Sequence, residues 1–106
     1  MNDMDKEEAL ASLDALVHQA EELIRQFDIT ITGAPAPNYG SNRYQKAAYA
    51  LDRLTRAEVQ LRDSHRHEVW EQTTVDGRNG EYLVSQITPL KQILQRTGEG
   101  APQPKP

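Results

Sequence analysis

The sequence predicts a mainly α-helical fold, in which an antiparallel pair of helices is closed by a short C-terminal helix. Two segments, residues 5–27 and 42–67, repeat apolar residues at the three- and four-residue steps of a helix. Neither segment contains proline or glycine, whereas both residues recur in the connection between them. A chain of 106 residues has room for one domain, which we place at residues 1–96.

The first predicted helix, residues 5–27, has a continuous apolar stripe and an acidic first turn, where the helix dipole favours negative charge. The stripe consists of Leu10, Leu13, Val17, Ala20, Ile24 and Phe27, widened by Leu16 and Leu23. Such a stripe is typical of a core, but it also fits the a and d positions of a heptad repeat. The alternative is therefore a seam with another chain. Its interface would consist of Leu13, Val17, Ile24 and the single tryptophan, Trp70.

The second predicted helix, residues 42–67, has Ser41 or Asn42 as its N-cap. Its apolar positions are Tyr44, Ala47, Ala48, Leu51, Leu54, Ala57 and Leu61. The alanines among them would let another helix approach closely. Before this helix, alternating isoleucine and threonine at residues 29–32 predict a short extended piece, followed by a loop at residues 33–40. The connection is longer than a plain helical hairpin needs.

Residues 69–87 support two interpretations. Two β-branched and aromatic runs flank the turn sequence at residues 76–80, which is typical of a small β-hairpin. Alternatively, the second helix continues to about Thr73 and a third begins near Gly80. The third helix would then place Leu83, Ile87, Leu90 and Leu94 on one face. Pro89 fits that alternative best if Thr88 caps a helix that begins at Pro89. Both interpretations predict helix from Pro89 to Arg96, and we favour the helical one.

Composition limits the location of the protein and the classes of site that it can hold. Residues 97–106 contain three prolines and two glycines, so we expect a flexible tail there. The absence of cysteine excludes disulfides and thiolate metal sites. The acidic start lacks the features of a secretory signal, and no apolar run reaches the roughly 20 residues that span a bilayer. We therefore expect a cytoplasmic protein.

The two predicted helices differ in charge. Residues 1–28 hold eight acidic and two basic residues, whereas residues 43–68 hold six basic and four acidic residues. We expect the two helices to face each other, with the alternative that the basic helix receives an anionic partner. Nucleic acid could be bound through Arg53, Arg56, Arg62 and Arg66, but the net charge of −4 makes this the least favoured partner.

No arrangement of residues predicts catalysis, a cofactor or a metal site. The only histidine cluster, His65 to Glu68, holds two histidines two positions apart, which point in different directions on a helix. We interpret it as a solvated helix end, where histidine and Arg66 also complement the dipole. Ser64 and His65 are sequence neighbours and cannot form a nucleophile–base relay. Glu21 and Glu22 are interpreted as part of a solvated polar face.

A ligand site is predicted at the start of the second helix. Tyr39, Asn42, Arg43, Tyr44 and Lys46 place aromatic rings, an amide and two cations beside the unpaired N–H groups of a helix N-terminus. This combination would suit a nucleotide or another phosphorylated molecule. The structural alternative is that Tyr44 packs in the core and the other residues cap the helix.

These patterns together predict a small non-enzymatic interaction protein that binds another protein, as its inhibitor or regulator, and forms a homo-oligomer. The lean apolar content, 37% of the residues, suggests that a second copy or a partner completes the core. The first alternative is a small-ligand binder that sequesters a nucleotide at residues 39–46. The second alternative is a nucleic-acid-associated regulator that uses the basic helix.

Overall fold

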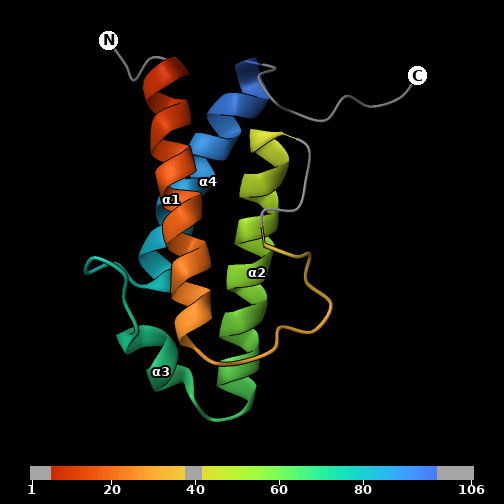
Figure 1. Cartoon of the computed structure of the whole chain (residues 1–106), viewed down its shortest axis with the longest axis vertical. Coiled ribbons are helices and arrows are strands. Elements are labelled where there is room, and N and C mark those ends of the chain that lie inside the picture. Colours follow the sequence, from red (N-terminus) through yellow and green to blue (C-terminus); the bar gives the residue numbers. More distant parts are fainter. Residues whose placement is uncertain (1–5, 38–41, 98–106) are drawn as a thin grey trace.

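Helices dominate the computed structural model, which describes residues 6–37 and 42–97 of the chain. The helices of these residues are α1 (Lys6–Gln26), α2 (Arg43–Asp63), α3 (His67–Gln72) and α4 (Gly80–Thr97). The three long helices α1, α2 and α4 each contact the other two. The short helix α3 lies at the end of the molecule where α1 and α2 finish (Figure 1). The predicted mainly helical class is therefore confirmed.

One apolar core lies between the three long helices. Its fully buried large side chains are Leu13, Leu23, Leu54, Leu61, Leu83, Ile87 and Leu94. The predicted stripes supply these residues because helical periodicity puts every third or fourth side chain on one face. Small residues of α2, Ala47, Ala50 and Ala57, are also buried and permit close packing. Periodicity therefore identified the core and the existence of α1 and α2.

The relative direction of α1 and α2 corrects the predicted antiparallel pair, because the two helices run parallel (Figure 1). Asp14 of α1 pairs with Arg43 at the start of α2, and Glu21 of α1 pairs with Arg53 further along α2. Partners that advance together along both helices require parallel axes. The antiparallel neighbour of both is α4, whose Lys91 lies 5.7 Å from the ring centroid of Tyr44 near the start of α2.

The connection between α1 and α2 is the physical reason for the parallel arrangement. It leaves the end of α1 and runs back along α2, held by side chains of α2 that donate hydrogen bonds to its carbonyl oxygens. These bonds join Gln60 to Thr30 (2.8 Å), Arg56 to Thr32 (3.4 Å) and Arg53 to Pro35 (2.9 Å). Because α2 is about 30 Å long at 1.5 Å per residue, only a long connection can return to its start. The predicted extended piece at residues 29–32 forms no strand.

The end of α2 comes earlier than predicted, at Asp63. His65 takes a left-handed conformation with φ of 62°. The Arg66 N–H then donates to the Leu61 carbonyl and the His65 N–H donates to the Arg62 carbonyl. This is the Schellman arrangement, with histidine where glycine is usual, and it stops the helix. Only the first two residues of the histidine cluster, His65 and Arg66, lie between helices, because α3 begins within the cluster at His67. The expected continuation of the second helix to about Thr73 is therefore wrong.

The predicted β-hairpin at residues 69–87 is wrong, and the helical alternative describes this region. Of the hairpin only the tight turn forms, where Val75 and Arg78 exchange both backbone hydrogen bonds around Asp76 and Gly77. Both turn residues have positive φ, as a two-residue turn of this hand requires. The described residues contain no strand, because the flanking runs coil into α3 and α4 and bury their apolar sides in the core.

Helix α4 starts at Gly80, as the helical alternative predicts, and continues through Pro89. The expected new start at Pro89 is wrong, since the Thr88 hydroxyl donates to the Val84 carbonyl one turn earlier instead of capping. The true cap is Asn79, whose side-chain oxygen accepts from the Tyr82 N–H at 2.9 Å. The predicted tail begins at Thr97, the last residue of α4, and its remainder lies outside the described residues.

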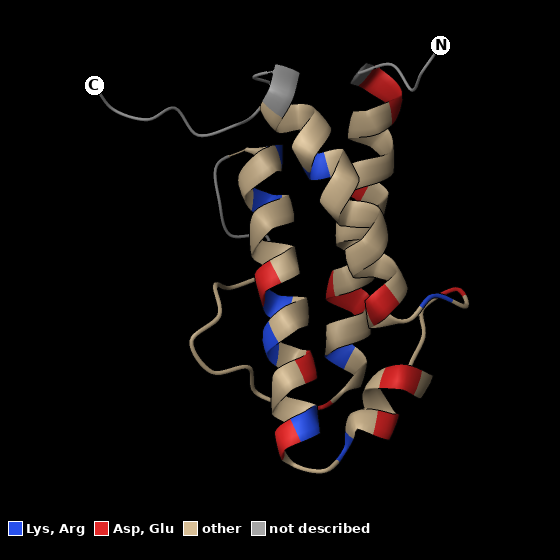
Figure 2. Ribbon diagram, turned by 180° about the vertical axis from the view of Figure 1, so that it is seen from behind, with Lys and Arg blue, Asp and Glu red and all other residues tan. Residues whose placement is uncertain are grey.

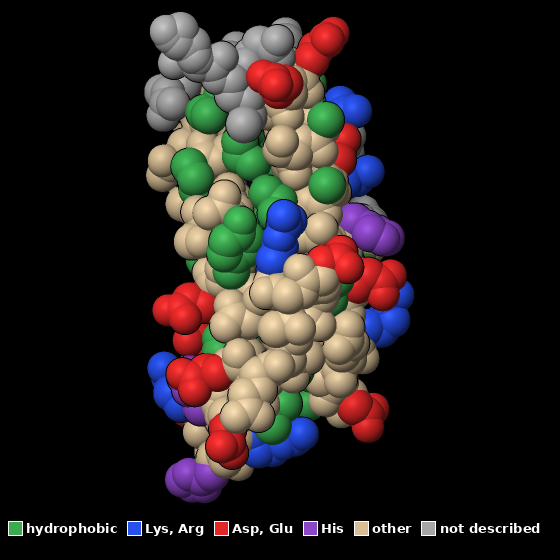
Figure 3. All heavy atoms as spheres, turned by 90° about the vertical axis from the view of Figure 1, so that its left-hand side faces the viewer, with side chains coloured by type: hydrophobic (Ala, Val, Ile, Leu, Met, Phe, Trp, Pro, Cys, Tyr) green, Lys and Arg blue, Asp and Glu red, His purple; other side chains and the backbone are tan. Residues whose placement is uncertain are grey.

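The surface of the described residues exposes few large hydrophobic side chains. Only Val59 and Tyr82 among them are classed as exposed, at 36% and 42%. On the side where α1 and α4 lie, hydrophobic side chains gather toward the upper part, whereas charged ones occur in both the upper and the lower part (Figure 3). None of the helices in residues 6–37 and 42–97 is both long and apolar enough to cross a bilayer.

Candidate ligand-binding pocket

Two charged side chains interrupt the buried faces of α1 and α2. Glu21 is 6% exposed and Arg53 is 12% exposed, and their Oε1 and Nε atoms lie 3.7 Å apart. Glu21 stands four positions after Val17 and three before Ile24, so it shares their face. The interpretation of Glu21 as a solvated residue is therefore corrected. The signal was present in the sequence as a carboxylate in register with an apolar stripe.

This ion pair is incompletely hydrogen bonded. A separation of 3.7 Å is too long for a hydrogen bond between Nε and Oε1. Neither atom has another hydrogen-bond partner among the described residues. Arg53 does donate from Nη1 to the Pro35 carbonyl at 2.9 Å, which orients the guanidinium. Buried polar atoms in proteins are usually satisfied, so a pair left in this state requires an explanation.

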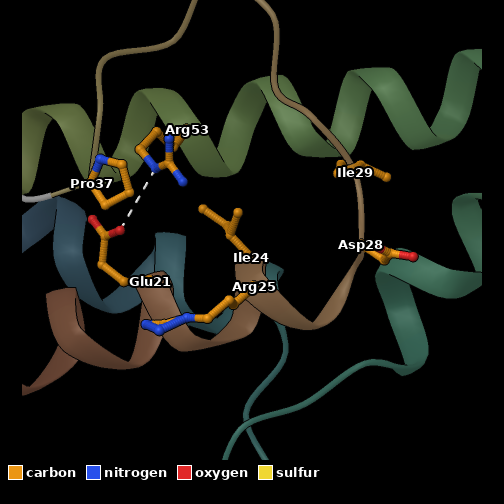
Figure 4. Close-up of a pocket in the computed structure, with 7 residues that line it drawn as sticks. All are labelled: Glu21, Ile24, Arg25, Asp28, Ile29, Pro37 and Arg53. Atoms are coloured by element: carbon orange, nitrogen blue, oxygen red, sulfur yellow. Dashed lines mark ion pairs between the residues drawn. The ribbon is translucent and has the colours of Figure 1, made fainter.

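The Glu21–Arg53 pair forms part of the wall of a pocket of about 560 Å³. We call it the Glu21–Arg53 pocket, and its other lining residues are Ile24, Arg25, Asp28, Ile29 and Pro37. The charged residues of the pair point toward each other from α1 and α2, with Pro37 beside them (Figure 4). The lining therefore combines two acids and two bases with three apolar residues. A volume of this size is within the range of small-molecule sites.

Local backbone structure builds the far end of the pocket. The Phe27 N–H donates to the Ile24 carbonyl, and Asp28 takes a left-handed φ of 55°. A single left-handed residue after the last turn ends a helix, and aspartate tolerates this conformation better than most residues. The chain therefore turns away from the axis of α1 and brings Ile29 beside α2. The position of Pro37 at the other end of the pocket is fixed by the hydrogen bonds from α2 to the carbonyl oxygens of the same connection.

The described side chains of the predicted ligand site at the start of α2 have separate partners and do not converge on one place. Asn42 is the N-cap, and its side-chain oxygen accepts from the Gln45 N–H at 2.8 Å. Arg43 turns to Asp14 and donates from Nε to both carboxylate oxygens, at 3.0 and 3.2 Å. Tyr44 lies half-buried beside Lys91. Lys46 is exposed, and Tyr39 lies outside the described residues. The structural alternative for this segment therefore fits better, and none of its described members lines the Glu21–Arg53 pocket.

The expected interface residues lie inside the chain's own core. Leu13, Val17, Ile24 and Trp70 are between 0% and 7% exposed. Trp70 packs against Phe27 with ring centroids 5.6 Å apart. These four side chains therefore do not form a surface for self-association, and their assignment as interface residues is corrected. Helical spacing alone cannot distinguish a stripe that packs within a chain from one that packs between chains.

Basic residues of α2 are largely matched by acids. Arg43 and Arg53 pair with α1, as the opposite charges of the two helices predict. Arg56 lies 3.0 Å from Asp52 on α2 itself. Figure 2 shows basic and acidic residues interspersed along this helix and not gathered on one side. The arrangement leaves little concentrated positive charge for contacts to a phosphate backbone.

Two of the three histidines among the described residues, His18 and His67, lie beside acidic residues. His67 is 3.7 Å from a carboxylate oxygen of Glu58 and of Glu71, and His18 is 3.8 Å from Glu22. No group of three histidine, aspartate or glutamate residues in residues 6–37 and 42–97 is arranged to hold a metal ion. The Ser64 hydroxyl donates to the Gln60 carbonyl, one turn back in α2.

Comparison with known proteins found no match. No family model, curated protein or solved structure is similar to this chain. Function is therefore argued from the pocket and its chemistry.

Proposed function

We propose that this protein is a non-enzymatic binding protein that holds a small polar ligand in the Glu21–Arg53 pocket. The observation that carries the proposal is the buried ion pair, because Glu21 and Arg53 both line an open pocket while their Oε1 and Nε atoms, which are themselves buried, have no hydrogen-bond partner among the described residues. The proposal keeps the ligand-binding alternative from the sequence but moves its site from the start of α2 to the space between α1, α2 and the connection.

Stability alone does not account for the pair. Removing a charged group from water costs several kcal/mol per ion, and a buried pair offsets that cost only with good geometry and further hydrogen bonds. At 3.7 Å, Glu21 and Arg53 lack good geometry, and among the described residues Oε1 and Nε have no hydrogen-bond partner, although Arg53 Nη1 donates to the Pro35 carbonyl. Apolar residues of similar size would stabilise the fold as well or better. A ligand that hydrogen bonds to the pair would give these charges a use.

The competing explanation is that the pair merely ties α1 to α2. Other contacts already join the two helices, including the leucine core and the Asp14–Arg43 pair. Replacing both charges distinguishes the explanations, because the variant Glu21→Leu/Arg53→Met keeps the volume and removes the polar groups. The loss of the Arg53–Pro35 hydrogen bond costs about 1 kcal/mol, and removal of the two buried charges gains about 1–4 kcal/mol, so we expect a free energy of unfolding equal to or above that of the unaltered protein.

The binding test is a thermal-shift screen of polar metabolites against the unaltered protein and this variant. Compounds that raise the midpoint of the unaltered protein should have no effect on Glu21→Leu/Arg53→Met. The matched control is Asp14→Leu/Arg43→Met, which removes an ion pair of the same helices outside the pocket and should keep every hit. The proposal would be contradicted if the compounds shifted the melting midpoint of the pocket variant as much as that of the control variant. A large loss of stability in the pocket variant would also contradict it.

Interaction with another protein, self-association and a cytoplasmic location stay predictions of the sequence. Burial of the expected interface residues gives the small-ligand function the stronger physical support. Sedimentation velocity tests self-association directly, since a monomer at micromolar concentration would contradict that prediction.

A further inference from the structure

We infer that the ligand of the Glu21–Arg53 pocket is a neutral molecule with a planar edge that both donates and accepts hydrogen bonds, such as a carboxamide or a lactam. The inference rests on the proposed function, because it specifies the chemistry of that same pocket. This ligand differs from the phosphorylated ones that the sequence suggested for residues 39–46, and the described residues of that segment do not line this pocket.

The first argument is the closeness of opposite charges. Because Oε1 of Glu21 and Nε of Arg53 are only 3.7 Å apart, any ligand group that contacts one side chain lies within a few ångströms of the other. An anion near Arg53 is therefore repelled by Glu21, and a cation near Glu21 is repelled by Arg53. Both side chains are almost completely buried, so water screens these repulsions poorly.

The second argument is the hydrogen-bonding character of the pair. The carboxylate only accepts hydrogen bonds and the guanidinium only donates them. A carboxamide offers an N–H and a C=O on one side, with nitrogen and oxygen about 2.2 Å apart from standard bond lengths. Such an edge can donate a hydrogen bond from its N–H to the carboxylate and accept one from the guanidinium at the same time. Phosphate esters at neutral pH offer mainly acceptors and leave the carboxylate unpaired.

The third argument is the rest of the lining. Arg25 and Asp28 add one positive and one negative charge, so the pocket as a whole favours neither anions nor cations. Ile24, Ile29 and Pro37 supply apolar surface for the body of the ligand. Together these features fit a neutral molecule with one polar edge and a compact apolar part.

Benzamide, benzoate and benzylamine form a matched set of probes, because they share one ring and differ in the charge of the polar group. Each is titrated into isotope-labelled protein, and the Ile24 and Ile29 methyl signals and the Arg53 Nε–H signal are followed. We expect benzamide to shift these signals saturably. Benzoate and benzylamine should bind at least about ten-fold more weakly, because each leaves one buried partner unpaired or repelled.

The variant Glu21→Gln gives a sharper test, because it removes the negative charge and keeps the shape. The pair then carries a net positive charge, so the preference should reverse and benzoate should bind more tightly than benzamide. Asp14→Asn is the matched control at the exposed pair and should keep the preference of the unaltered protein. Circular dichroism verifies that both variants fold.

The outcomes separate this inference from the proposed function. If all three probes bind the pocket equally, or benzoate binds best to the unaltered protein, the inference is overturned while the pocket remains a ligand site. If benzamide shifts none of the three signals, or Glu21→Gln leaves the preference unchanged, the inference is also overturned. The thermal-shift screen with Glu21→Leu/Arg53→Met then decides the proposed function independently.

Discussion

Substitution of Gly80 by alanine tests the packing of α3 on α4. An ideal Cβ at Gly80 would lie 2.2, 2.3 and 2.8 Å from three atoms of the Trp70 ring. Ordinary contact between carbon atoms needs about 3.5–4 Å, so the ring must move by more than about 1 Å. Trp70 is 2% exposed and packs against Phe27, which leaves it little room. The close approach is the reason that only glycine fits at the start of α4.

The magnitude follows from two opposing contributions. Overpacking of a buried site costs about 1–3 kcal/mol, whereas alanine is favoured over glycine within a helix by up to about 1 kcal/mol. We expect Gly80→Ala to lower the free energy of unfolding by about 1–2 kcal/mol. For a domain of this size that corresponds to a fall in the melting temperature of roughly 4–16 °C.

The assay is chemical denaturation followed by circular dichroism, as a double-mutant cycle with Trp70→Leu. Leucine lacks the ring atoms that meet the new Cβ, so Gly80→Ala should become neutral or slightly stabilising in that background. The coupling free energy should then be at least about 1 kcal/mol. Trp70 is the only tryptophan, so its fluorescence also reports directly on displacement of the ring.

Gly77→Ala is the matched control, because nothing lies within 4 Å of its Cβ position and its φ of 76° makes the cost purely conformational. It should destabilise by about 1–2 kcal/mol without coupling to Trp70. The reasoning is refuted if Gly80→Ala is as stable as the unaltered protein with unchanged fluorescence, or if its effect persists in full beside Leu at position 70.

Three further experiments test local features of the helices. Asn79→Ala should destabilise by about 1 kcal/mol in urea denaturation, because the N-cap of α4 is lost; an unchanged midpoint would contradict the cap. A double-mutant cycle on Asp14 and Arg43, both half exposed, should give a coupling below about 1 kcal/mol that falls at high salt, whereas a larger, salt-independent value would indicate effective burial. Pro89→Ala should raise the melting temperature, with a gain of about 1–3 kcal/mol, because an exposed proline inside α4 removes one backbone hydrogen bond of the helix; destabilisation would show that Pro89 has a packing role.

Local interactions explain what could be predicted. Helical periodicity, capping and turn formation depend on residues a few positions apart, so the sequence predicted α1, the start of α2 at Asn42 and the start of α4 near Gly80. The opposite charges of the first two helices also predicted that they would pair, as Asp14 and Arg43 do. The hairpin competed with the helix at residues 69–87 because the turn at Asp76 and Gly77 fits either, and only packing of the flanking runs decides between them.

The sequence by itself therefore determined that most of residues 5–27 and 42–67 coil and which of their faces are apolar. The tertiary structure alone decided that α1 and α2 run parallel, since that depends on hydrogen bonds from α2 to a distant connection. It also decided that Glu21 and Arg53 are buried together. A charge beside an apolar stripe can reach solvent or meet a partner, and which of these happens depends on the helix that packs against it. The candidate site lies among these non-local contacts, which is why periodicity could not locate it.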